Sequence, residues 1–317
     1  MRIVSLLPAA TEIVAAIGLG DRLVGRTHEC DWPPAAGAVP AVTRNLLACD
    51  PADGAAIDRA VARAAGGGEP LYRLDERALA TARPDLVIAQ ELCGVCAVGG
   101  EEAEAAARAL PGSPAVVSLD PRSLDGVLEA MLAVGEAAGA PSTARRVVAG
   151  LRGRIDRVRD LVAGRPVRRV VCLEWLDPPF AAGHWVPDQV AAAGGVDLLG
   201  RPGGRSERLR DEDVVAADPR ALLLMPCGWD VGRAVAAARD AGVARRYAGT
   251  RAVARGRVVA LDGGAHFSRP GPRLVEGVEA LARVLHPDVA GPPRAGEAMT
   301  VTAAVLAPAM SARGRAG

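Results

Sequence analysis

The sequence predicts an α/β protein made of two Rossmann-like lobes with parallel sheets, joined by one long α-helix. Three observations predict it. Short apolar runs of strand length alternate with helical patterns along the chain, which is typical of parallel sheets. The segment 74–90 matches the segment 209–226 in its acidic helix start, apolar spacing, proline and buried strand. A long helical pattern, with no strand inside it, separates these two similar halves.

The long helix is predicted over residues 142–164. Pro141 and Ser142 provide a start signal, and Gly164 with Pro166 provides a stop signal. A helix of this length spans roughly 30 Å, about the diameter of a small domain. The pattern also fits an ordinary surface helix, but the similarity of the two halves favours a strut between lobes. Apolar residues recur on one face at steps of four, four, three and four: Val147, Leu151, Ile155, Val158 and Val162.

These features divide the chain into four parts. We expect an N-terminal lobe at residues 1–138, the connecting helix at 139–165 and a C-terminal lobe at 166–289. The tail, 290–317, is rich in Ala, Gly and Pro and shows no periodicity, so we expect it to be disordered.

The individual elements follow from apolar runs and from the Gly, Pro and polar residues that bound them. In the N-terminal lobe we expect strands at 3–7, 23–25, 86–89 and 115–119, and helices at 11–17, 50–65, 75–82, 101–110 and 124–138. In the C-terminal lobe we expect strands at 167–173, 221–225 and 257–261, and helices at 187–193, 211–216, 231–241 and 272–285.

Composition and charge restrict the partners and the compartment. The 38 basic and 37 acidic residues nearly balance, which argues against nucleic acid or an acidic membrane as the main partner. No run reaches the ~18 apolar residues of a membrane span. Pro8 and Glu12 interrupt the first apolar run, and no small-residue cleavage site precedes it. We therefore expect a cytoplasmic protein; a misplaced start would instead make it periplasmic or extracellular.

The scarce aromatic residues gather after predicted strands. Ligands of open parallel sheets bind at the carboxyl ends of the strands. Rings from both halves therefore predict a cleft between the lobes for a large, flat or apolar ligand with a few polar handles. For any single Trp, packing over a sheet end is the alternative. The residues in these loops are Trp32, Trp175, Phe180, Trp185, Trp229 and Phe267, with His28, His184 and His266.

Cysteine and histidine residues suggest a second kind of site. In a cytoplasmic protein the cysteines are expected to be reduced thiols or metal ligands. Zinc, iron or an iron–sulfur cluster could take Cys30, Cys93 and Cys96, with His28 as the fourth ligand. Residues 97–100 delay the next helix, which makes a redox dithiol the weaker interpretation. Free thiols that touch a ligand and inert buried thiols are the alternatives.

Other chemical signatures are few. The sequence has no phosphate-binding P-loop, no G-x-S-x-G and no H-E-x-x-H, so catalysis is the less favoured interpretation. Glu91 and Glu174 lie where strands meet loops, and each could hold a ligand, dock a partner or be solvated. Cys49 and Cys172 are interpreted as structural.

At this point the sequence resembles a known family. Residues 2–34, 174–187 and 268–287 are similar to segments of cobalamin-binding proteins of the periplasmic-binding-protein class, the class III type with a helical backbone. The resemblance covers about residues 1–288. It implies two Rossmann-like lobes, a rigid connecting helix, limited hinge motion and a corrinoid or iron chelate in the cleft. Typical members deliver their ligand to an ABC importer by docking one glutamate of each lobe onto the permease.

The chain differs from typical members in lacking an export signal and in carrying the His28, Cys30, Cys93 and Cys96 set, so it resembles a cytosolic branch of the family. We expect non-catalytic binding of cobalamin or a related metal chelate, with His184 or His266 near the metal. The alternative is a metal- or iron–sulfur-binding protein or enzyme that uses the Cys and His set. The expected ligand contacts are Pro8, Ala9, Thr11, Glu29, Trp32, Glu91, Trp175, Phe180, His184, Trp185, Trp229, His266 and Phe267.

Overall fold

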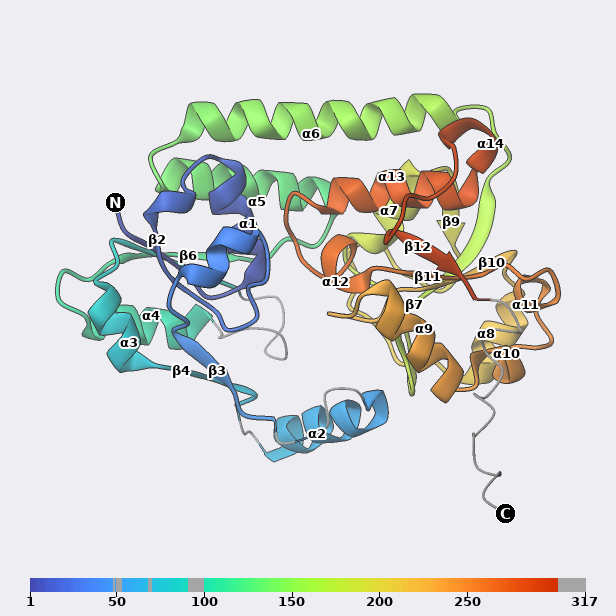
Figure 1. Ribbon diagram of the computed structural model, residues 1–317, viewed down its shortest axis with the longest axis horizontal. Coiled ribbons are helices and arrows are strands. Elements are labelled where there is room, and N and C mark those ends of the chain that lie inside the picture. Colours follow the sequence, from blue (N-terminus) through green and yellow to red (C-terminus); the bar gives the residue numbers. More distant parts are fainter. Residues whose placement is uncertain (48, 50–52, 68–69, 91–99, 302–317) are drawn as a thin grey trace, which may run out of the picture.

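The computed structural model describes residues 1–47, 49, 53–67, 70–90 and 100–301. It confirms the two α/β lobes and the long connecting helix (Figure 1). The connecting helix, α6 (Pro141–Val162), runs above both lobes, with α5 (Leu124–Ala137) below it on the N-lobe side and α13 (Leu274–Leu285) on the C-lobe side. Within the described part of the chain, no helix combines the length and the apolar character needed to cross a membrane.

The N-lobe is built on a four-stranded parallel sheet in the order β2-β1-β5-β6. Its central strands β1 and β5 are buried along their whole length, because helices cover both faces of the sheet. The strands are β1 (Ile3–Ser5), β2 (Leu23–Arg26), β5 (Leu86–Gln90) and β6 (Ala115–Leu119). The helices besides α5 are α1 (Pro8–Ala16), α3 (Glu76–Ala82) and α4 (Gly100–Ala109), with short 3₁₀ turns at Gly20–Arg22 and Pro34–Ala38.

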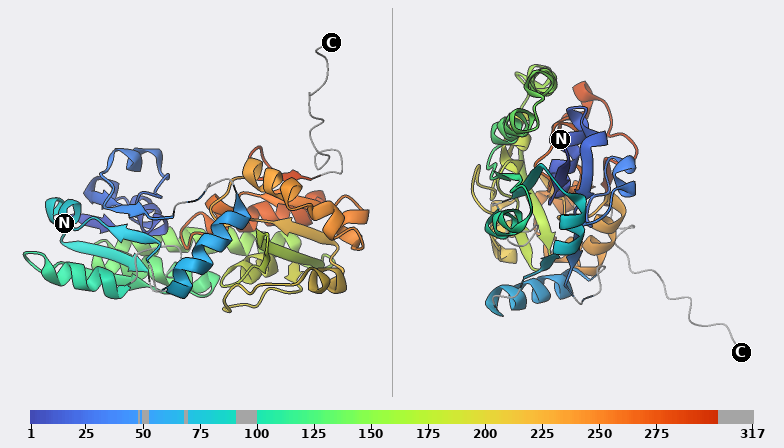
Figure 2. Two further views of the ribbon diagram at one scale, coloured as in Figure 1. Left: turned by 90° about the horizontal axis from the view of Figure 1, so that it is seen from below. Right: turned by 90° about the vertical axis from the view of Figure 1, so that its left-hand side faces the viewer.

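An arm projects from this lobe. The antiparallel strands β3 (Thr43–Asn45) and β4 (Tyr72–Leu74) carry helix α2 (Gly54–Gly67), which lies across the gap between the lobes in two views (Figures 1 and 2). The sequence predicts the helix but not the strands, because three residues are too few to show an alternating pattern.

The C-lobe sheet is mixed rather than purely parallel. Strands β7, β9, β10 and β11 are parallel, whereas β8 and β12 pair antiparallel with β7 and β11. The strands are β7 (Arg168–Leu176), β8 (Pro179–Ala181), β9 (Gly195–Asp197), β10 (Ala221–Leu224), β11 (Val258–Leu261) and β12 (Ala298–Thr300). The helices besides α13 are α7 (Val186–Ala192), α8 (Asp211–Ala217), α9 (Val231–Asp240), α10 (Val243–Arg246), α11 (Arg251–Ala254), α12 (Gly263–His266) and α14 (Pro287–Ala290).

The expectation of a disordered tail from residue 290 is wrong for its first part. Strand β12 extends the sheet, and Val301 donates to the Val258 carbonyl at 2.8 Å. Glu297 accepts two hydrogen bonds from the buried Arg283 at 2.7 and 2.9 Å. These long-range contacts, rather than a local pattern, order residues 290–301. Residues 302–317 lie outside the described part of the chain.

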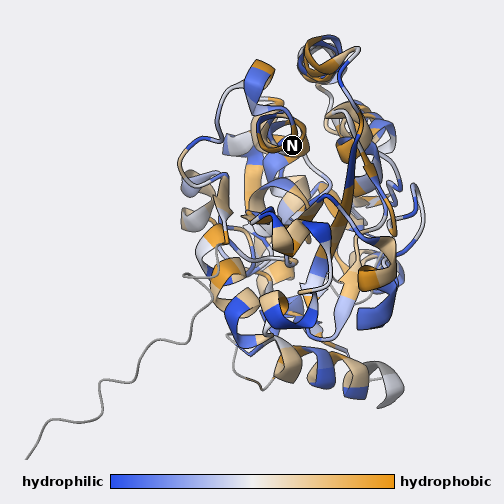
Figure 3. Ribbon diagram, turned by 90° about the vertical axis from the view of Figure 1, so that its right-hand side faces the viewer, coloured by the Kyte–Doolittle hydropathy of each residue, from blue (hydrophilic) through white to orange (hydrophobic). Residues whose placement is uncertain are grey.

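Helix α6 acts as the predicted strut. Its buried side chains belong to one hydrophobic core that includes residues of both lobes. Figure 3 looks nearly along the axis of α6, at the top of the molecule, and shows both hydrophobic and hydrophilic residues around it. Arg154 donates to both carboxylate oxygens of Glu279 on α13 at 2.8 and 3.0 Å. The buried face of α6 is Ala144, Val148, Leu151, Ile155, Val158 and Val162, so Val148 takes the position predicted for Val147.

Candidate functional site

A cleft of about 810 Å³ lies between the lobes. Its walls follow the carboxyl ends of the strands: residues 7–9 come after β1, and Gln90 ends β5. On the C-lobe side, residues 174–175 end β7, and residues 225–229 follow β10. In a parallel sheet the loops that follow the strands lie together at the carboxyl ends of the strands. The carboxyl ends of the strands in the two sheets therefore face each other across the cleft.

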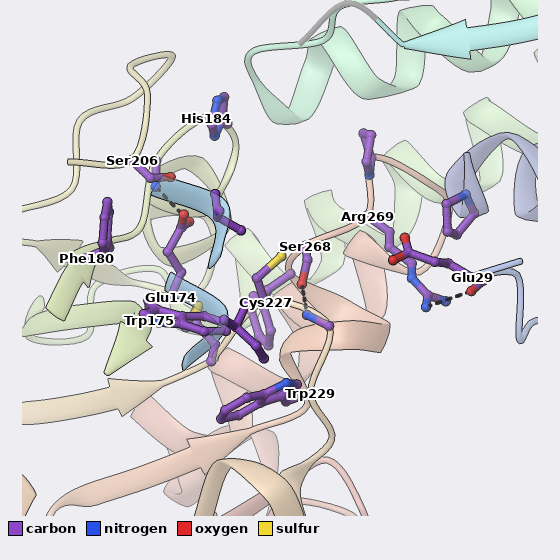
Figure 4. A pocket seen from close by; sticks show the side chains of 18 of the residues that line it. Glu29, Glu174, Trp175, Phe180, His184, Ser206, Cys227, Trp229, Ser268 and Arg269 are labelled. Carbon is purple, nitrogen blue, oxygen red and sulfur yellow. Dashed lines mark hydrogen bonds between the residues drawn. The ribbon is translucent and has the colours of Figure 1, made fainter. Parts of the chain in front are cut away.

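Aromatic rings form the C-lobe wall of the cleft (Figure 4). The rings of Trp175 and Trp229 lie 5.1 Å apart between centroids and are tilted by 48°. Behind them, Trp185 donates through Nε1 to the Phe267 carbonyl at 2.7 Å. Phe180 also lines this wall. Trp175 and Phe180 lie on strands β7 and β8, not in a loop as predicted, because the β7–β8 hairpin continues the sheet beyond residue 173.

Close backbone packing holds the loop that carries Trp229. Gly264 donates its N–H to the Trp229 carbonyl at 3.0 Å, and Gly228 donates to Ser268 Oγ at 3.1 Å. A Cβ on Gly263 would lie 2.1 Å from the Pro226 carbonyl oxygen, so only glycine fits there. The start of α12 therefore positions the wall formed by the β10 loop.

Polar groups face the same cleft from both lobes. Glu29 accepts a hydrogen bond from Tyr72 Oη at 3.0 Å, and Glu174 Oε2 accepts from the Gly183 N–H at 3.4 Å. Arg233 places its guanidinium 4.6 Å from the ring centre of Trp229. Arg269 is held by carboxylates of the N-lobe, including Asp31 Oδ2 at 2.9 Å. The cleft therefore combines apolar rings with acceptors and with two arginines, Arg233 and Arg269, that already have partners.

His184 lines the cleft beside the aromatic wall. Its backbone is in the left-handed region at φ 53°, held by hydrogen bonds to Gly203 and Gly204 at 2.9 and 2.7 Å. Its ring centroid lies 5.6 Å from that of Trp185. Burial lowers the pKa of His184, and Arg122 and Arg205 lower it further against an opposing effect of Asp120. The imidazole is therefore neutral at pH 7, with a lone pair available.

Helix α2 contributes a part of the cleft that the sequence interpretation missed. Ile57, Asp58 and Val61 line the cleft from the arm of the N-lobe. At the start of the helix, a Cβ on Gly54 would lie 3.2 Å from the Trp229 ring. The spacing of Ile57 and Val61, four residues apart on an Ala-rich helix, was an available signal. Cys49 also lines the cleft, contrary to its interpretation as structural only.

Nine of the expected ligand contacts lie at the cleft, and their contact with a ligand stays a prediction. Three others lie elsewhere, and Glu91 is outside the described residues. Thr11 is buried, with Oγ1 2.9 Å from Cys30 Sγ. Trp32 is 46% exposed, and the Arg273 guanidinium lies 5.3 Å from its ring centre. The nine at the cleft are Pro8, Ala9, Glu29, Trp175, Phe180, His184, Trp185, Trp229 and Phe267.

His266 is the third residue away from the cleft lining. Its Nε2 lies 3.5 Å from Glu276 Oε2 on the neighbouring helix α13. The short helix α12 carries His266 toward α13, whereas the next residue, Phe267, reaches the cleft. Of the two histidines expected near a bound metal, only His184 is therefore placed to reach one.

The predicted metal site cannot be assembled from the described residues. Cys93 and Cys96 lie outside them. Cys30 is buried; burial raises the pKa of its thiol, against the hydrogen bond with Thr11, and keeps it protonated. His28 Nδ1 lies 2.8 Å from Thr43 Oγ1. In the part of the chain that the structure describes, no three His, Cys, Asp or Glu residues are grouped to hold a metal ion.

The fold and the cleft define a ligand-binding protein of two lobes that one long helix connects. A family model described as periplasmic binding protein matches residues 3–265, and the chain belongs to this family. It is therefore a substrate-binding protein.

Three similar proteins show what the chain is related to, and two of them are described by their ligand. A cobalamin-binding protein of Halobacterium salinarum is 28% identical over 172 residues, 52% of this chain, which spans less than half of that relative's length (45%). An uncharacterized ABC transporter substrate-binding lipoprotein of Bacillus subtilis is 24% identical over 294 residues, 90% of this chain and 80% of that protein. The apo structure of a periplasmic heme-binding protein from Roseiflexus matches with a TM-score of 0.68 and 26% identity, covering 91% of this chain and 98% of that one.

Proposed function

We propose that this protein binds a corrinoid such as cobalamin in the cleft between its lobes, without catalysis. The observation that carries the proposal is the aromatic wall of Trp175 and Trp229, which faces carboxylate and amide groups across the cleft. A corrinoid is a flat apolar macrocycle with amide groups around its edge. Aromatic rings can stack on the face of the macrocycle, and hydrogen-bond acceptors of the cleft can bind the amide N–H groups at its edge.

The charge of the cleft favours neutral amides over carboxylates on the ligand. Of the three arginines among the described lining residues, Arg269 pairs with Asp31, and Arg233 lies over the Trp229 ring. Glu29, Glu174 and Asp58 add acceptors to the lining. A ligand with carboxylate groups would meet these acceptors with little free positive charge to offset them.

Heme is the second candidate ligand, and His184 is the observation that favours it. A neutral imidazole at the cleft can donate its lone pair to heme iron, whereas cobalamin can bind through its face and edge alone. Arg205, next to Ser206 in the lining, would then be the cation available to a propionate.

We further propose that the bound ligand is passed to the permease of an ABC importer. The family membership and the description of the Bacillus subtilis relative support this role. The cytoplasmic location expected from the sequence stays a prediction, and it competes with this role, because delivery to an importer requires the opposite side of the membrane. Fractionation of cells distinguishes the two locations.

Titration with cyanocobalamin, followed by tryptophan fluorescence and calorimetry, tests the proposed ligand. We expect saturable binding with quenching, because three tryptophans line the cleft. Trp175→Ala should weaken binding roughly tenfold or more, the loss expected for one stacked ring.

Trp32→Ala is the matched control, since Trp32 is exposed and outside the cleft lining. It should leave the affinity unchanged. A titration with hemin in parallel separates the two candidates. Failure of both ligands to bind the folded protein would overturn the proposal.

A further inference from the structure

A second concave site lies at the opposite edge of the C-lobe sheet from the ligand cleft. It has a volume of about 530 Å³ and lies at the amino ends of β7, β10 and β11, toward the right-hand side of Figure 1. Six arginines and no carboxylate-bearing residue occur among its described lining residues. The whole chain has a formal net charge of only +1, so this is a local concentration of positive charge. The arginines are Arg168, Arg169, Arg220, Arg255, Arg257 and Arg283.

The strand register brings these charges together. Arg220 donates its backbone N–H to the Arg169 carbonyl at 2.9 Å, so the two arginines stand side by side at the starts of β10 and β7. Leu222 donates to the Arg257 carbonyl at 3.0 Å, which places Arg257 at the start of the next strand. Like charges on neighbouring strands destabilise a sheet. Their clustering therefore costs folding energy that an anionic ligand would offset.

The nearby carboxylates neutralise the cluster only in part, because the charge of Arg169 acts on Asp218 in addition to the pairing of Asp218 with Arg251. Glu297 is bound by Arg283, and Asp218 is bound by Arg251 outside the pocket at 2.6 Å. Among the described residues, the side chains of Arg169, Arg220, Arg255 and Arg257 make no hydrogen bond or ion pair with any partner. The guanidinium groups of Arg220, Arg255 and Arg257 are thus available at one concave surface, with Arg169 beside them.

We propose that this pocket binds a small anion with several phosphate groups. Guanidinium groups bind phosphate oxygens in bidentate geometry, and several of them around one concavity match several phosphates. The volume suits a small molecule rather than a macromolecular surface. The lining also includes Val284, Leu285 and Pro287, which can accommodate an apolar part of an organic phosphate. A soluble polyphosphate and a lipid headgroup share this chemistry.

Calorimetric titration with tripolyphosphate at low ionic strength tests the proposal with the full chain. We expect saturable binding that Arg220→Gln/Arg257→Gln weakens roughly tenfold or more, as for lost hydrogen bonds to charged groups. The control is Arg146→Gln/Arg157→Gln, which removes the same charge from the exposed side of α6. Its affinity should match that of the parent. Equal losses in both double variants, or no saturable binding by the parent, would overturn the proposal.

A second variant and a second probe complete the test. Arg255→Gln changes one exposed loop side chain. It replaces the double variant in the titration if the double variant has a lowered melting temperature. Flotation with phosphatidylcholine vesicles, with and without cardiolipin, whose headgroup carries two phosphates, identifies a lipid source. Binding to either probe that depends on Arg220 and Arg257 supports the phosphate site. Binding of polyglutamate alone, with neither phosphate probe bound, would contradict it.

Discussion

Glu12 on α1 of the N-lobe forms a bidentate ion pair with Arg273 at the start of α13 in the C-lobe. Arg273 Nη2 lies 2.6 Å from Oε1, and Nε lies 3.0 Å from Oε2. The Glu12 side chain is only 1% exposed. Arg269 approaches Glu12 at 3.5 Å and also binds Asp31 of the N-lobe. Two carboxylates of one lobe therefore hold two arginines of the other, which fixes the angle between the lobes beside the cleft.

Replacement of Glu12 by Gln should destabilise the protein strongly. The change leaves buried guanidinium charge uncompensated, which typically costs roughly 3–5 kcal/mol. Denaturant unfolding measures this loss. The control, Glu136→Gln, breaks the exposed pair with Arg145, which should cost less than about 1 kcal/mol. Similar losses in the two variants would show that Glu12 does not hold the lobes together.

Asp31 makes the stability of the lobe arrangement depend on pH. Burial raises the pKa of Asp31, but the hydrogen bond and charge of Arg269 outweigh it, so the pKa in the folded protein is lowered. A carboxyl whose pKa is lower in the folded protein than in the unfolded chain stabilises the folded protein. This stabilisation is fully present at pH values above the unfolded pKa of about 3.9, and it is lost as the pH falls through the folded pKa. The melting temperatures of the parent and Asp31→Asn should therefore differ at neutral pH and converge in acid. A difference that is constant with pH would exclude this linkage.

The contact between α2 and the aromatic wall should affect ligand binding. Gly54→Leu places a side chain where a Cβ already lies 3.2 Å from Trp229 and 3.6 Å from Trp175. We expect α2 to be displaced, the tryptophan emission to shift, and cyanocobalamin affinity to fall roughly tenfold. Gly66→Leu, on the same helix with no neighbour within 4 Å, is the control. Equal effects of both changes on affinity would show that the contact with the wall is unimportant.

His184 should determine how the cleft binds heme. Burial, with the charges of Arg122 and Arg205, lowers the pKa of His184 from the ordinary histidine value of about 6.5, so the imidazole is neutral at pH 7 and becomes protonated only in more acid solution. Hemin affinity should be constant near pH 7 and fall as the pH drops below 6.5, because protonation removes the lone pair. His184→Ala should abolish the shift of the heme absorption band, and His266→Ala should retain it. A band that shifts equally in both variants would place the iron ligand elsewhere.

The sequence predicts the elements whose apolar pattern is long and local. Helix α6 and the central strands β1, β5 and β10 lie where their patterns place them, within a few residues. The face of α6 was predicted one residue away at Val147, because adjacent valines at 147 and 148 both fit the spacing. Strands of three residues, such as β12, depend on long-range pairing and carry no pattern of their own.

The candidate site was predicted where it depends on strand order and missed where it depends on tertiary packing. Trp185 and Trp229 follow or adjoin strand ends and lie at the cleft. Trp32 also follows a strand, but it lies outside the lining, beside Arg273 of the other lobe. The arm that brings α2 over the cleft could not be predicted, because its position is set by a hairpin of two three-residue strands.

Native mass spectrometry of the purified protein with an equimolar mixture of cyanocobalamin and hemin tests the central claim most directly. The two ligands differ in mass, so a single spectrum gives both the identity and the stoichiometry of what is bound. The account predicts one cyanocobalamin per chain, and loss of this complex in Trp175→Ala but not in Trp32→Ala. A folded protein that binds neither ligand, or a corrinoid complex that survives Trp175→Ala unchanged, would contradict it.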